Sequence, residues 1–368
     1  MNNCLGIINL DGNESKMGEL VVNRPLASVP IAARYRIIDF VLSNMTNSGI
    51  DCIGIFTKNK SRSLIDHLTN GKPWDLNRKK DGLRVFNFGK DDPSYEDVHN
   101  FAENIEFFKY SHKEYILLAP SYMICNINYE EIINYHKKSC KDVTIVYKNI
   151  KETKGSFEDC NVLNLGDLGD VISIGENIGN CKNVNISMEM YVLKTSTFID
   201  IIHKCIRSGM YRKVRDYIAG NLDSLRVGAY EFEGHLECIN SLKSLYNANL
   251  ALLNRRISKE IFSEERPIFT KSKDEAPTHY TNSSNVINSI IANGCYVKGE
   301  VENCVIGRRV YIGEGVKLKN CVIMQNSRVE DNAVLDNVIA DKGTEIKKNE
   351  KLIGSQLYPL FIKKNKVV

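Results

Sequence analysis

Three arginines near the amino terminus, Arg24, Arg34 and Arg36, are the residues best suited by type and spacing to bind an anion. The planar guanidinium of arginine can donate two parallel hydrogen bonds to one phosphate group, so grouped arginines are typical of phosphate sites. Arginines also form ion pairs with carboxylates at surfaces and interfaces. The three residues alone leave both roles open.

The histidines and cysteines show no spacing that predicts a metal site. The seven histidines form no HxxxH or HExxH pair, and the eleven cysteines include no CxxC pair. The cysteines are odd in number and scattered, and no signal peptide is recognisable, which predicts reduced thiols in the cytoplasm. No apolar run reaches the roughly 18 residues of a membrane span, so no membrane association is expected.

Composition indicates an ordinary globular chain. Of its 368 residues 43% are hydrophobic and 26% charged, and the net charge is only +4. At roughly 100–200 residues per domain, this length predicts two domains. The chain lacks the basic stripe that is typical of nucleic-acid-binding proteins, so no nucleic-acid partner is expected.

Up to about residue 260, short β-branched runs alternate with amphipathic stretches. This alternation predicts an α/β domain with a mostly parallel sheet covered by helices. The predicted strands are Leu5–Leu10, Cys52–Thr57, Tyr115–Leu118, Val143–Tyr147 and Met188–Leu193. The predicted helices are Asp39–Ser48, Lys60–Leu68, Tyr129–Lys138 and Thr195–Arg207.

From about Val286 the apolar residues recur every six positions, with Arg328 as the one misfit. This period predicts a parallel β-helix of hexapeptide repeats, in which each coil buries its apolar face against its neighbours. An antiparallel meander would instead show a period of two. The apolar frame comprises Cys304, Val310, Val316, Val322, Val334, Ala340 and Ile346. The predicted domains are therefore residues 1–265 and 286–368, joined by a polar linker at 266–285.

The segment from Arg24 to Asn44, followed by Asn47-Ser48-Gly49-Ile50, resembles the start of glucose-1-phosphate adenylyltransferase (ADP-glucose pyrophosphorylase). Further matches in order extend the resemblance over nearly the whole chain: Trp74-Asp75-Leu76, Asp142–Ile145, Ser187-Met188, Tyr191-Val192, Ala248-Asn249, Leu252-Leu253 and Asp341-Lys342. The resemblance implies a Rossmann-like, GT-A-like nucleotidyltransferase domain, a left-handed β-helix and a tetramer.

Transfer of AMP from ATP to a sugar phosphate needs a backbone cradle for phosphates, cations and a magnesium ion held by carboxylates. This chain departs from the family at each of these groups. Leu26 and Asn177 stand where the family has phosphate-binding lysines, and Cys238 stands in place of a metal-binding aspartate. The other metal-binding aspartate corresponds to Ser121 or Tyr122.

The phosphate loop departs in the same way. The family's glycine-rich segment corresponds to residues 9–20, which hold two glycines in a different spacing and three acidic residues. Glu237, next to Cys238, could supply a carboxylate, but adjacent strand positions point to opposite faces. Losing the metal alone should cost on the order of a thousandfold in rate.

This pattern resembles the GlgD-type branch of the family. The resemblance implies a regulatory, non-catalytic subunit that holds no cofactor of its own and joins a catalytic, Mg²⁺-binding GlgC-type subunit in a heterotetramer, or forms a homo-oligomer when alone. The positions of Arg24 and Arg36 belong to the family's pocket for sugar-phosphate effectors, and Arg34 lies between them. The alternatives are an active enzyme with a rebuilt site and a free-standing sugar-phosphate sensor. A hexapeptide acyltransferase is disfavoured because no histidine falls within the predicted β-helix.

Overall fold

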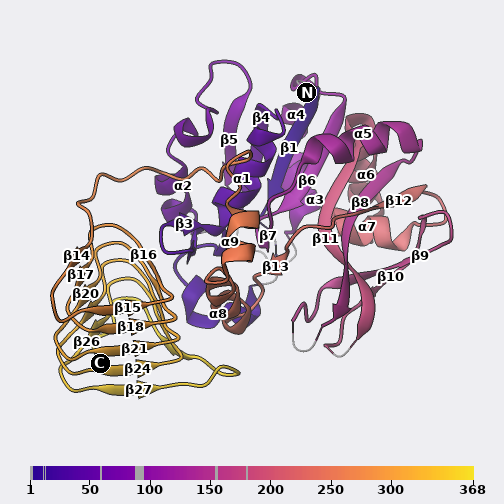
Figure 1. The fold of residues 1–368 in the computed structure, drawn as a ribbon. Coiled ribbons are helices and arrows are strands. Elements are labelled where there is room, and N and C mark those ends of the chain that lie inside the picture. Colours follow the sequence, from indigo (N-terminus) through magenta and orange to yellow (C-terminus); the bar gives the residue numbers. More distant parts are fainter. Residues whose placement is uncertain are drawn as a thin grey trace. The chain divides into compact units, whose positions relative to one another are not determined.

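The computed structural model describes residues 3–10, 12, 14–58, 60–87, 95–153, 156–179 and 181–368. The chain forms two compact units (Figure 1). The first comprises Met1–Gly12, Phe40–Cys238 and Ser263–Phe269, and the second comprises Asn13–Asp39, Ile239–Phe262 and Thr270–Val368. Asn13–Asp39 and Ile239–Phe262 precede the predicted linker, yet they belong to the same unit as the carboxy-terminal residues. No periodicity in the sequence marks this boundary.

A nine-stranded sheet forms the framework of the first unit. Strands β6, β1, β4 and β5 are neighbours in that order and run parallel, whereas β11 pairs antiparallel with both β6 and β8. The mostly parallel sheet predicted from the sequence is therefore confirmed, with β11 as the main reversal. The strands are β1 Cys4–Asn9, β4 Cys52–Thr57, β5 Gly82–Asn87, β6 Tyr115–Pro120, β8 Val143–Glu152, β9 Asn161–Leu165, β10 Val171–Glu176, β11 Lys182–Lys194 and β12 Val227–Glu231. A separate two-stranded sheet pairs β7 Met123–Ile124 with β13 Glu237–Cys238.

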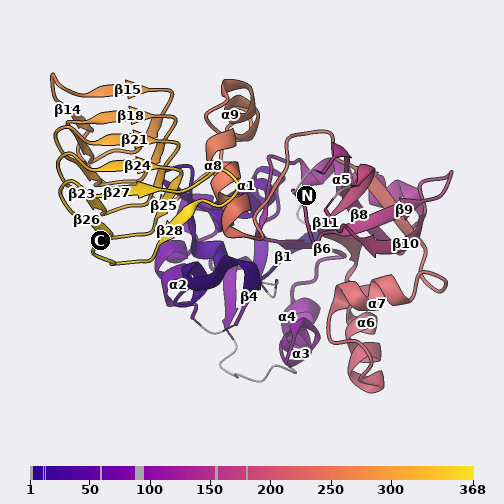
Figure 2. The same ribbon diagram turned by 90° about the horizontal axis from the view of Figure 1, so that it is seen from below.

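Helices cover both faces of the large sheet (Figure 2). Leu5 and Ile7 of β1 face a core shared with α3, α4, α6 and α7. Gly6 faces the other way, onto α1, so closely that a Cβ atom there would lie 2.8 Å from the sulfur of Met45. The helices are α1 Ile37–Asn47, α2 Arg62–Leu68, α3 Asp97–Glu103, α4 Ile105–Tyr110, α5 Tyr129–Ser139, α6 Thr195–Ser208 and α7 Val214–Gly220. The four helices predicted from the sequence are confirmed as α1, α2, α5 and α6.

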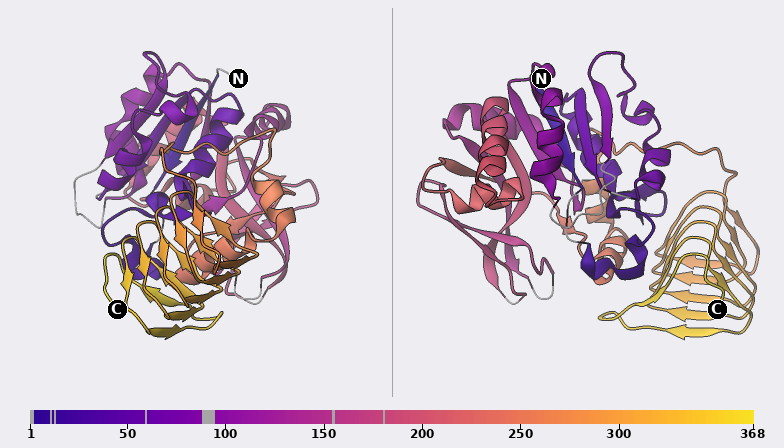
Figure 3. Two further views of the ribbon diagram at one scale, coloured as in Figure 1. Left: turned by 60° about the vertical axis from the view of Figure 1, so that its left-hand side comes forward. Right: turned by 180° about the vertical axis from the view of Figure 1, so that it is seen from behind.

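Three five-stranded parallel sheets form the sides of the β-helix in the second unit, and each successive coil adds one strand to each sheet (Figure 3). The first sheet contains β14 His279–Tyr280, β17 Tyr296–Val297, β20 Tyr311–Ile312, β23 Arg328–Val329 and β26 Glu345–Ile346. The second contains β15 Asn285–Ile287, β18 Glu300–Glu302, β21 Lys317–Lys319, β24 Val334–Asp336 and β27 Lys351–Ile353. The third contains β16 Ile290–Ile291, β19 Val305–Ile306, β22 Val322–Ile323, β25 Val338–Ala340 and β28 Leu360–Ile362.

The β-helix begins earlier than the sequence suggests, because β14 already pairs with β17. His279 therefore lies in the first coil, and the expectation of a β-helix without histidine is wrong. The His279 ring stacks on that of Tyr296 with 4.7 Å between ring centroids. The polar composition around Pro277 conceals this first coil, since its strand is only two residues long.

The six-residue frame holds only in part, because the later coils take 17 residues rather than three full hexapeptides. Val301, Leu318 and Leu335 lie in register at this spacing. The frame therefore slips: Arg328 is exposed, and Ala333 and Leu335 are buried in place of the half-buried Val334.

The remaining elements of the second unit are 3₁₀ helices at Ser15–Val21 (η1) and Leu26–Ser28 (η2), the hairpin of β2 Pro30–Ile31 and β3 Tyr35–Arg36, and helices α8 Leu242–Ala251 and α9 Arg255–Ile261. Helix α8 is fixed to the β-helix by Tyr246. Its hydroxyl donates to the backbone oxygen of Asn320 or to Oδ1 of Asn337, each 2.8 Å away. Within the described ranges, no helix is long and apolar enough to cross a membrane.

Candidate functional site

The carboxyl ends of β1 and β6 meet at one edge of the large sheet, where an α/β nucleotidyltransferase would hold its nucleotide. Tyr122 follows β6 there, and its hydroxyl donates a 2.5 Å hydrogen bond to Oε2 of Glu189. The Tyr122 ring lies against Gly12, where a Cβ atom would be 3.2 Å from it. A tyrosine side chain therefore fills the space next to the loop that corresponds to the family's phosphate cradle.

Glu189 is the centre of this arrangement. Arg215 Nη1 lies 2.9 Å from Glu189 Oε1 and forms an ion pair with it. Burial and the nearby Glu189 charge both raise the pKa of Tyr122 well above its ordinary value, so the hydroxyl keeps its proton. Burial lowers the pKa of Arg215, but the charge of Glu189 and the other acidic groups nearby together outweigh burial, and the pKa is raised. Both carboxylate oxygens of Glu189 are thus engaged by protein groups.

Asp97 is the other carboxylate that lines this edge. It is buried, and its Oδ2 accepts from Asn9 Nδ2 at 2.9 Å while its Oδ1 accepts from the backbone N–H of Val214 at 3.0 Å. These contacts connect the end of β1 to the starts of α3 and α7. Asp97 therefore positions backbone elements and presents no open carboxylate edge to a ligand.

The cavity between these residues is small. Its volume is about 30 Å³, with Asn9, Gly12, Tyr122, Glu189 and Arg215 among the lining residues. A water molecule needs about 10–15 Å³ of such volume, so the cavity accepts one or two waters. It does not accept a nucleoside triphosphate together with a sugar phosphate.

Cys238 and Cys160 form a buried thiol pair beside this edge. Cys238 lies in β13, and its Sγ atom is 3.4 Å from Sγ of Cys160. The hydrogen bond with Cys160 and burial raise the pKa of Cys238 well above its ordinary value. The neighbouring Glu237 carboxylate contacts His235 Nε2 at 2.9 Å. The Glu237 carboxylate is therefore already engaged by a protein group.

Asn177 and Leu26 serve local structure. Asn177 is buried; its Nδ2 donates to the Phe157 carbonyl at 2.7 Å, and its Oδ1 accepts from the Gly179 amide at 3.1 Å. Leu26 belongs to the second unit and is buried there, with its amide donating to Glu14. Ser121 is buried at the end of β6. The structure thus brings Ser121 and Tyr122 to the same edge, while Asn177 closes a turn.

The residues that the structure describes at this edge do not fit a magnesium ion. Magnesium needs carboxylate oxygens in a nearly octahedral arrangement, and both oxygens of Asp97 and of Glu189, the described carboxylates that line the cavity, already contact protein groups. Across the part of the chain that the structure describes, no three His, Cys, Asp or Glu side chains are close enough to hold a metal.

A second candidate site, the cation cluster, lies within the second unit. We define it as Arg34, Arg36, Lys273, Arg308 and Lys342, with Arg24 at its base. Arg24 is buried, its Nη2 lies 2.7 Å from Asp341 Oδ1, and its Nε donates to the Leu20 carbonyl. Its charge is therefore compensated by Asp341.

Two lysines of the cation cluster, Lys273 and Lys342, have lowered pKa values. Burial, followed by the charges of Arg36 and Arg24, lowers the pKa of Lys342 to about 7. Burial, followed by the charges of Arg308, Arg309 and Arg36, lowers the pKa of Lys273. Arg36 thus contributes positive potential at both lysines.

Arg34 and Arg308 extend the cation cluster. Burial and the charge of Arg34 lower the pKa of Arg308, whose buried Nε has no hydrogen-bond partner among the described residues. The exposed Arg34 donates to the Tyr35 hydroxyl at 3.0 Å. A buried guanidinium N–H without an acceptor, among several lysines and arginines, is the environment in which an anion would be bound.

Sequence reasoning identified the three amino-terminal arginines but missed Lys273, Arg308 and Lys342. Lys342 could have been found, because Asp341-Lys342 is one of the motifs that carry the family resemblance. Glu189 and Arg215 were also missed. Glu189 adopts a positive φ of 52° at an irregularity in β11, which no local sequence signal marks.

Comparison with known proteins agrees with this fold. The nucleotidyl transferase family matches residues 7–212, and the GlmU-like, C-terminal hexapeptide family matches residues 275–357. The chain is 33% identical to the glycogen biosynthesis protein GlgD of Bacillus subtilis over 100% of its length and 97% of that protein. It is 36% identical to GlgD of Geobacillus stearothermophilus, over 85% and 82% of the two chains.

A glucose-1-phosphate adenylyltransferase of Mycoplasma mobile is 29% identical over 86% of this chain and 84% of that enzyme. Fold and matches together define a nucleotidyl transferase domain followed by a hexapeptide-repeat domain. The chain belongs to the nucleotidyl transferase family and, within it, to the GlgD branch of glycogen biosynthesis proteins.

Proposed function

We propose that this chain is a non-catalytic, regulatory subunit of ADP-glucose pyrophosphorylase in the cytoplasm. It assembles with a catalytic GlgC-type subunit, which holds the Mg²⁺, and it changes that subunit's response to a phosphorylated sugar. The observation that carries the proposal is the hydrogen bond between Tyr122 and Glu189, together with the Arg215 ion pair. These three side chains occupy the edge of the sheet at which the reaction would take place.

Electrostatics supports the absence of catalysis. Phosphoryl chemistry of this kind depends on a metal ion and positioned cations to stabilise the transferring charge. Here the nearby carboxylates are hydrogen-bonded within the protein, and Cys238 offers a protonated thiol where a metal ligand would be needed. An active enzyme with a rebuilt site would need an open carboxylate pair, which the described residues of this edge do not supply.

The cation cluster supports the regulatory part of the proposal. Burial lowers the pKa of Lys273 and of Lys342, and repulsion by Arg36 lowers the pKa of both lysines further. A phosphorylated sugar would relieve that repulsion and accept hydrogen bonds from several cations at once. The same observation favours one second candidate, a free-standing sugar-phosphate sensor that needs no partner.

The test compares the purified full-length chain, the catalytic subunit from the same cell, and the two co-expressed. We expect the chain alone to make no ADP-glucose above background from ATP, glucose 1-phosphate and magnesium. We expect the co-expressed pair to form a mixed tetramer whose activation by sugar phosphates differs from that of the catalytic subunit alone. Turnover by the isolated chain would overturn the non-catalytic assignment.

If the chain binds a sugar phosphate but neither co-purifies with the catalytic subunit nor alters its kinetics, the sensor alternative replaces the subunit proposal. Arg36→Gln in the mixed tetramer separates regulation from assembly, because it removes a cation from the cluster without changing the β-helix. Lys366→Gln is the matched control, since Lys366 is exposed near the carboxyl terminus.

A further inference from the structure

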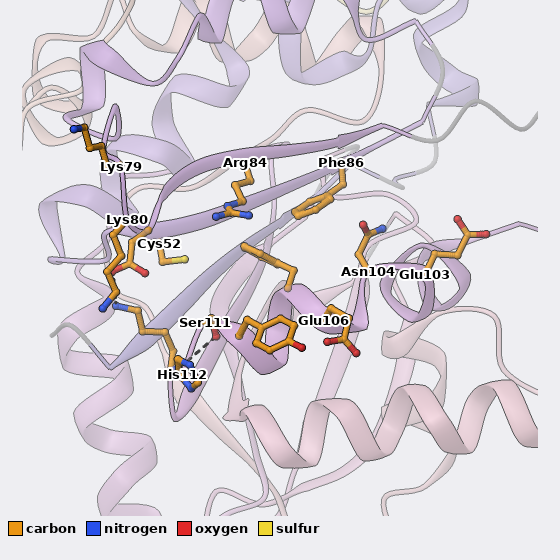
Figure 4. A pocket seen from close by; sticks show the side chains of 14 residues that line it. Cys52, Lys79, Lys80, Arg84, Phe86, Glu103, Asn104, Glu106, Ser111 and His112 are labelled. Carbon is orange, nitrogen blue, oxygen red and sulfur yellow. Dashed lines mark hydrogen bonds and ion pairs between the residues drawn. The ribbon is translucent and has the colours of Figure 1, made fainter.

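A cavity of about 620 Å³ lies in the first unit, beside the amino-terminal ends of β4 and β5 (Figure 4). Cys52 is the first residue of β4, and Lys113 comes just before β6. The Tyr122–Glu189 network lies at the opposite, carboxyl ends of the parallel strands. The cavity is therefore distinct from that network, and its volume is within the roughly 300–1,000 Å³ of small-molecule sites.

One end of the cavity is positively charged. Lys79, Lys80 and Arg84 line it, and none of the three forms an ion pair with any residue that the structure describes. The acidic neighbours Asp81 and Asp51 are balanced by two other cations, because Lys113 Nζ lies 3.5 Å from Asp81 and 3.1 Å from Asp51, and Arg78 Nη1 lies 3.7 Å from Asp51. The free cations therefore leave an uncompensated positive charge.

An aromatic wall lies between the two ends. Arg84 and Phe86 are two residues apart on the edge strand β5 and so share one face of it. The Phe86 and Phe107 rings are 4.8 Å apart, and the Arg84 guanidinium lies 6.0 Å from the centre of Phe107. Phe107 can lie against the sheet because residue 54 is glycine: a Cβ atom there would be 2.6 Å from the ring.

The far end of the cavity is acidic. Glu103, Asn104 and Glu106 lie at the side away from Lys79 and Lys80 (Figure 4). Among the residues that the structure describes, the one ion pair of Glu106 is a long, exposed contact of 3.6 Å with Lys109. Its carboxylate can accept a hydrogen bond from a ligand. The three zones thus follow one another as cations, aromatic rings and carboxylates.

We propose that this cavity binds a nucleotide whose base carries an exocyclic amino group, with the phosphate at Lys79, Lys80 and Arg84, the base against Phe86 and Phe107, and the amino group donating to Glu106. A phosphate requires the cationic end, and a planar base gains contact from the aromatic wall. A sugar phosphate lacks the planar ring, and an acidic peptide would be repelled by Glu103 and Glu106. The proposal goes beyond the regulatory function above and does not depend on it.

Direct binding to the purified full-length chain tests the proposal, with AMP, UMP, adenosine and inorganic phosphate as probes in isothermal titration calorimetry. We expect AMP to bind in the micromolar range, and UMP, adenosine and phosphate each to bind about tenfold or more weakly. UMP retains the phosphate but has a smaller, pyrimidine base that carries no amino group. Adenosine therefore reports on the cationic end, whereas UMP reports on the aromatic wall and the acidic end together.

Two variants locate the site. Lys80→Gln/Arg84→Gln should weaken AMP binding about tenfold or more, and Glu106→Gln should reduce the preference for AMP over UMP. All three side chains are exposed, so the melting temperature should not change. Lys138→Gln on α5, an exposed cation outside the cavity, is the matched control and should leave binding unaltered.

Three outcomes would overturn the proposal: no AMP binding at about 1 mM, equal affinity for AMP and UMP, or binding that persists in Lys80→Gln/Arg84→Gln but disappears in Arg36→Gln. The last result would place the nucleotide in the cation cluster. None of these outcomes bears on whether the chain is non-catalytic or joins a catalytic subunit, because the assay contains neither that subunit nor the substrates of the reaction.

Discussion

The hydroxyl of Tyr122 lies 2.5 Å from Oε2 of Glu189 and donates a hydrogen bond to it. Tyr122 stands at or next to the position where the family resemblance places a metal-binding aspartate. Glu189 comes from an irregularity in β11, with Ser187 Oγ accepting a hydrogen bond from its backbone N–H. A position expected to attract a cation has therefore become part of a hydrogen-bonded contact between the segment that follows β6 and strand β11, with Arg215 neutralising Glu189.

Tyr122→Phe should destabilise the chain and leave it inactive. The substitution removes a hydrogen bond to a charged group, which is worth about 1.5–3 kcal/mol. Arg215 still neutralises Glu189, so no metal site is opened. Urea unfolding measures the loss, and Tyr358→Phe, at an 82% exposed tyrosine, is the control that should show none. An unchanged free energy of unfolding in Tyr122→Phe would mean that the hydrogen bond does not hold this edge together.

Restoring an aspartate at residue 238 should not restore catalysis. The new carboxylate would be buried beside Cys160 with no cation to pair with, and an unpaired buried charge costs about 3–5 kcal/mol. Burial raises the pKa of such a carboxyl group, so the folded protein takes up a proton before the unfolded chain does as the pH falls. The destabilisation of Cys238→Asp should therefore be largest near pH 7 and decrease toward pH 5.

Cys238→Ser is the control for that experiment, since it keeps a small hydrogen-bonding group without adding charge. Thermal melts at several pH values give the comparison. A Cys238→Asp variant that was as stable as Cys238→Ser at pH 7, and bound magnesium, would show that a rebuilt metal site is within reach of this fold.

Regular periodicity was readable from the sequence, whereas contacts between distant segments were not. Strand β4 was predicted closely because it is a short apolar run that is buried along its whole length, and helices α5 and α6 because their apolar positions follow one face. The β-helix was also predicted, but its 17-residue coils shift the six-residue frame. The first coil was missed because its strand is short and polar.

The candidate sites show the same contrast between what local sequence predicts and what contacts between distant segments determine. The sequence predicted which family groups are absent, such as the aspartate that the resemblance places at Cys238. It did not reveal what fills the space, because Glu189 and Arg215 are positioned by a strand irregularity and a distant helix. Likewise, Arg308 and Lys342 join Arg36 only after the β-helix coils have stacked.

Arg24 should matter for stability rather than for effector response. It forms a buried ion pair with Asp341, and removing one partner of such a pair costs about 3–5 kcal/mol. Arg24→Met alone should therefore unfold at much lower urea concentration. Arg24→Met/Asp341→Asn should recover much of the loss, because the asparagine leaves no unpaired charge and keeps an acceptor for the Lys342 amide.

The control for Arg24 is the exposed pair between Lys363 and Glu19, whose atoms lie 3.5 Å apart. Exposed pairs contribute about 0–1 kcal/mol, so Lys363→Gln should have little effect. If Arg24→Met instead kept its stability and lost activation by sugar phosphates in the mixed tetramer, Arg24 would be an effector ligand.

Lys342 should make the stability of the folded chain rise as the pH increases above about 7. Burial and the charges of Arg36 and Arg24 lower its pKa to about 7, against about 10.4 for an unfolded lysine. Below pH 7 the residue is charged in both states, so the full cost of a charged lysine in this cluster is present. As the pH rises above 7, the folded protein releases the proton while the unfolded chain keeps it, and the contribution of Lys342 to stability rises.

Lys342→Met removes that titration. The difference in melting temperature between Lys342→Met and the native chain should therefore be largest at pH 6 and shrink toward pH 9, with the variant the more stable at low pH. Lys366→Met, at an exposed lysine, should show no such trend. A saturating sugar bisphosphate should also shrink the difference, because a bound anion stabilises the charged lysine. A constant difference from pH 6 to pH 9 would show that Lys342 remains charged throughout and that the cation cluster is already neutralised within the protein.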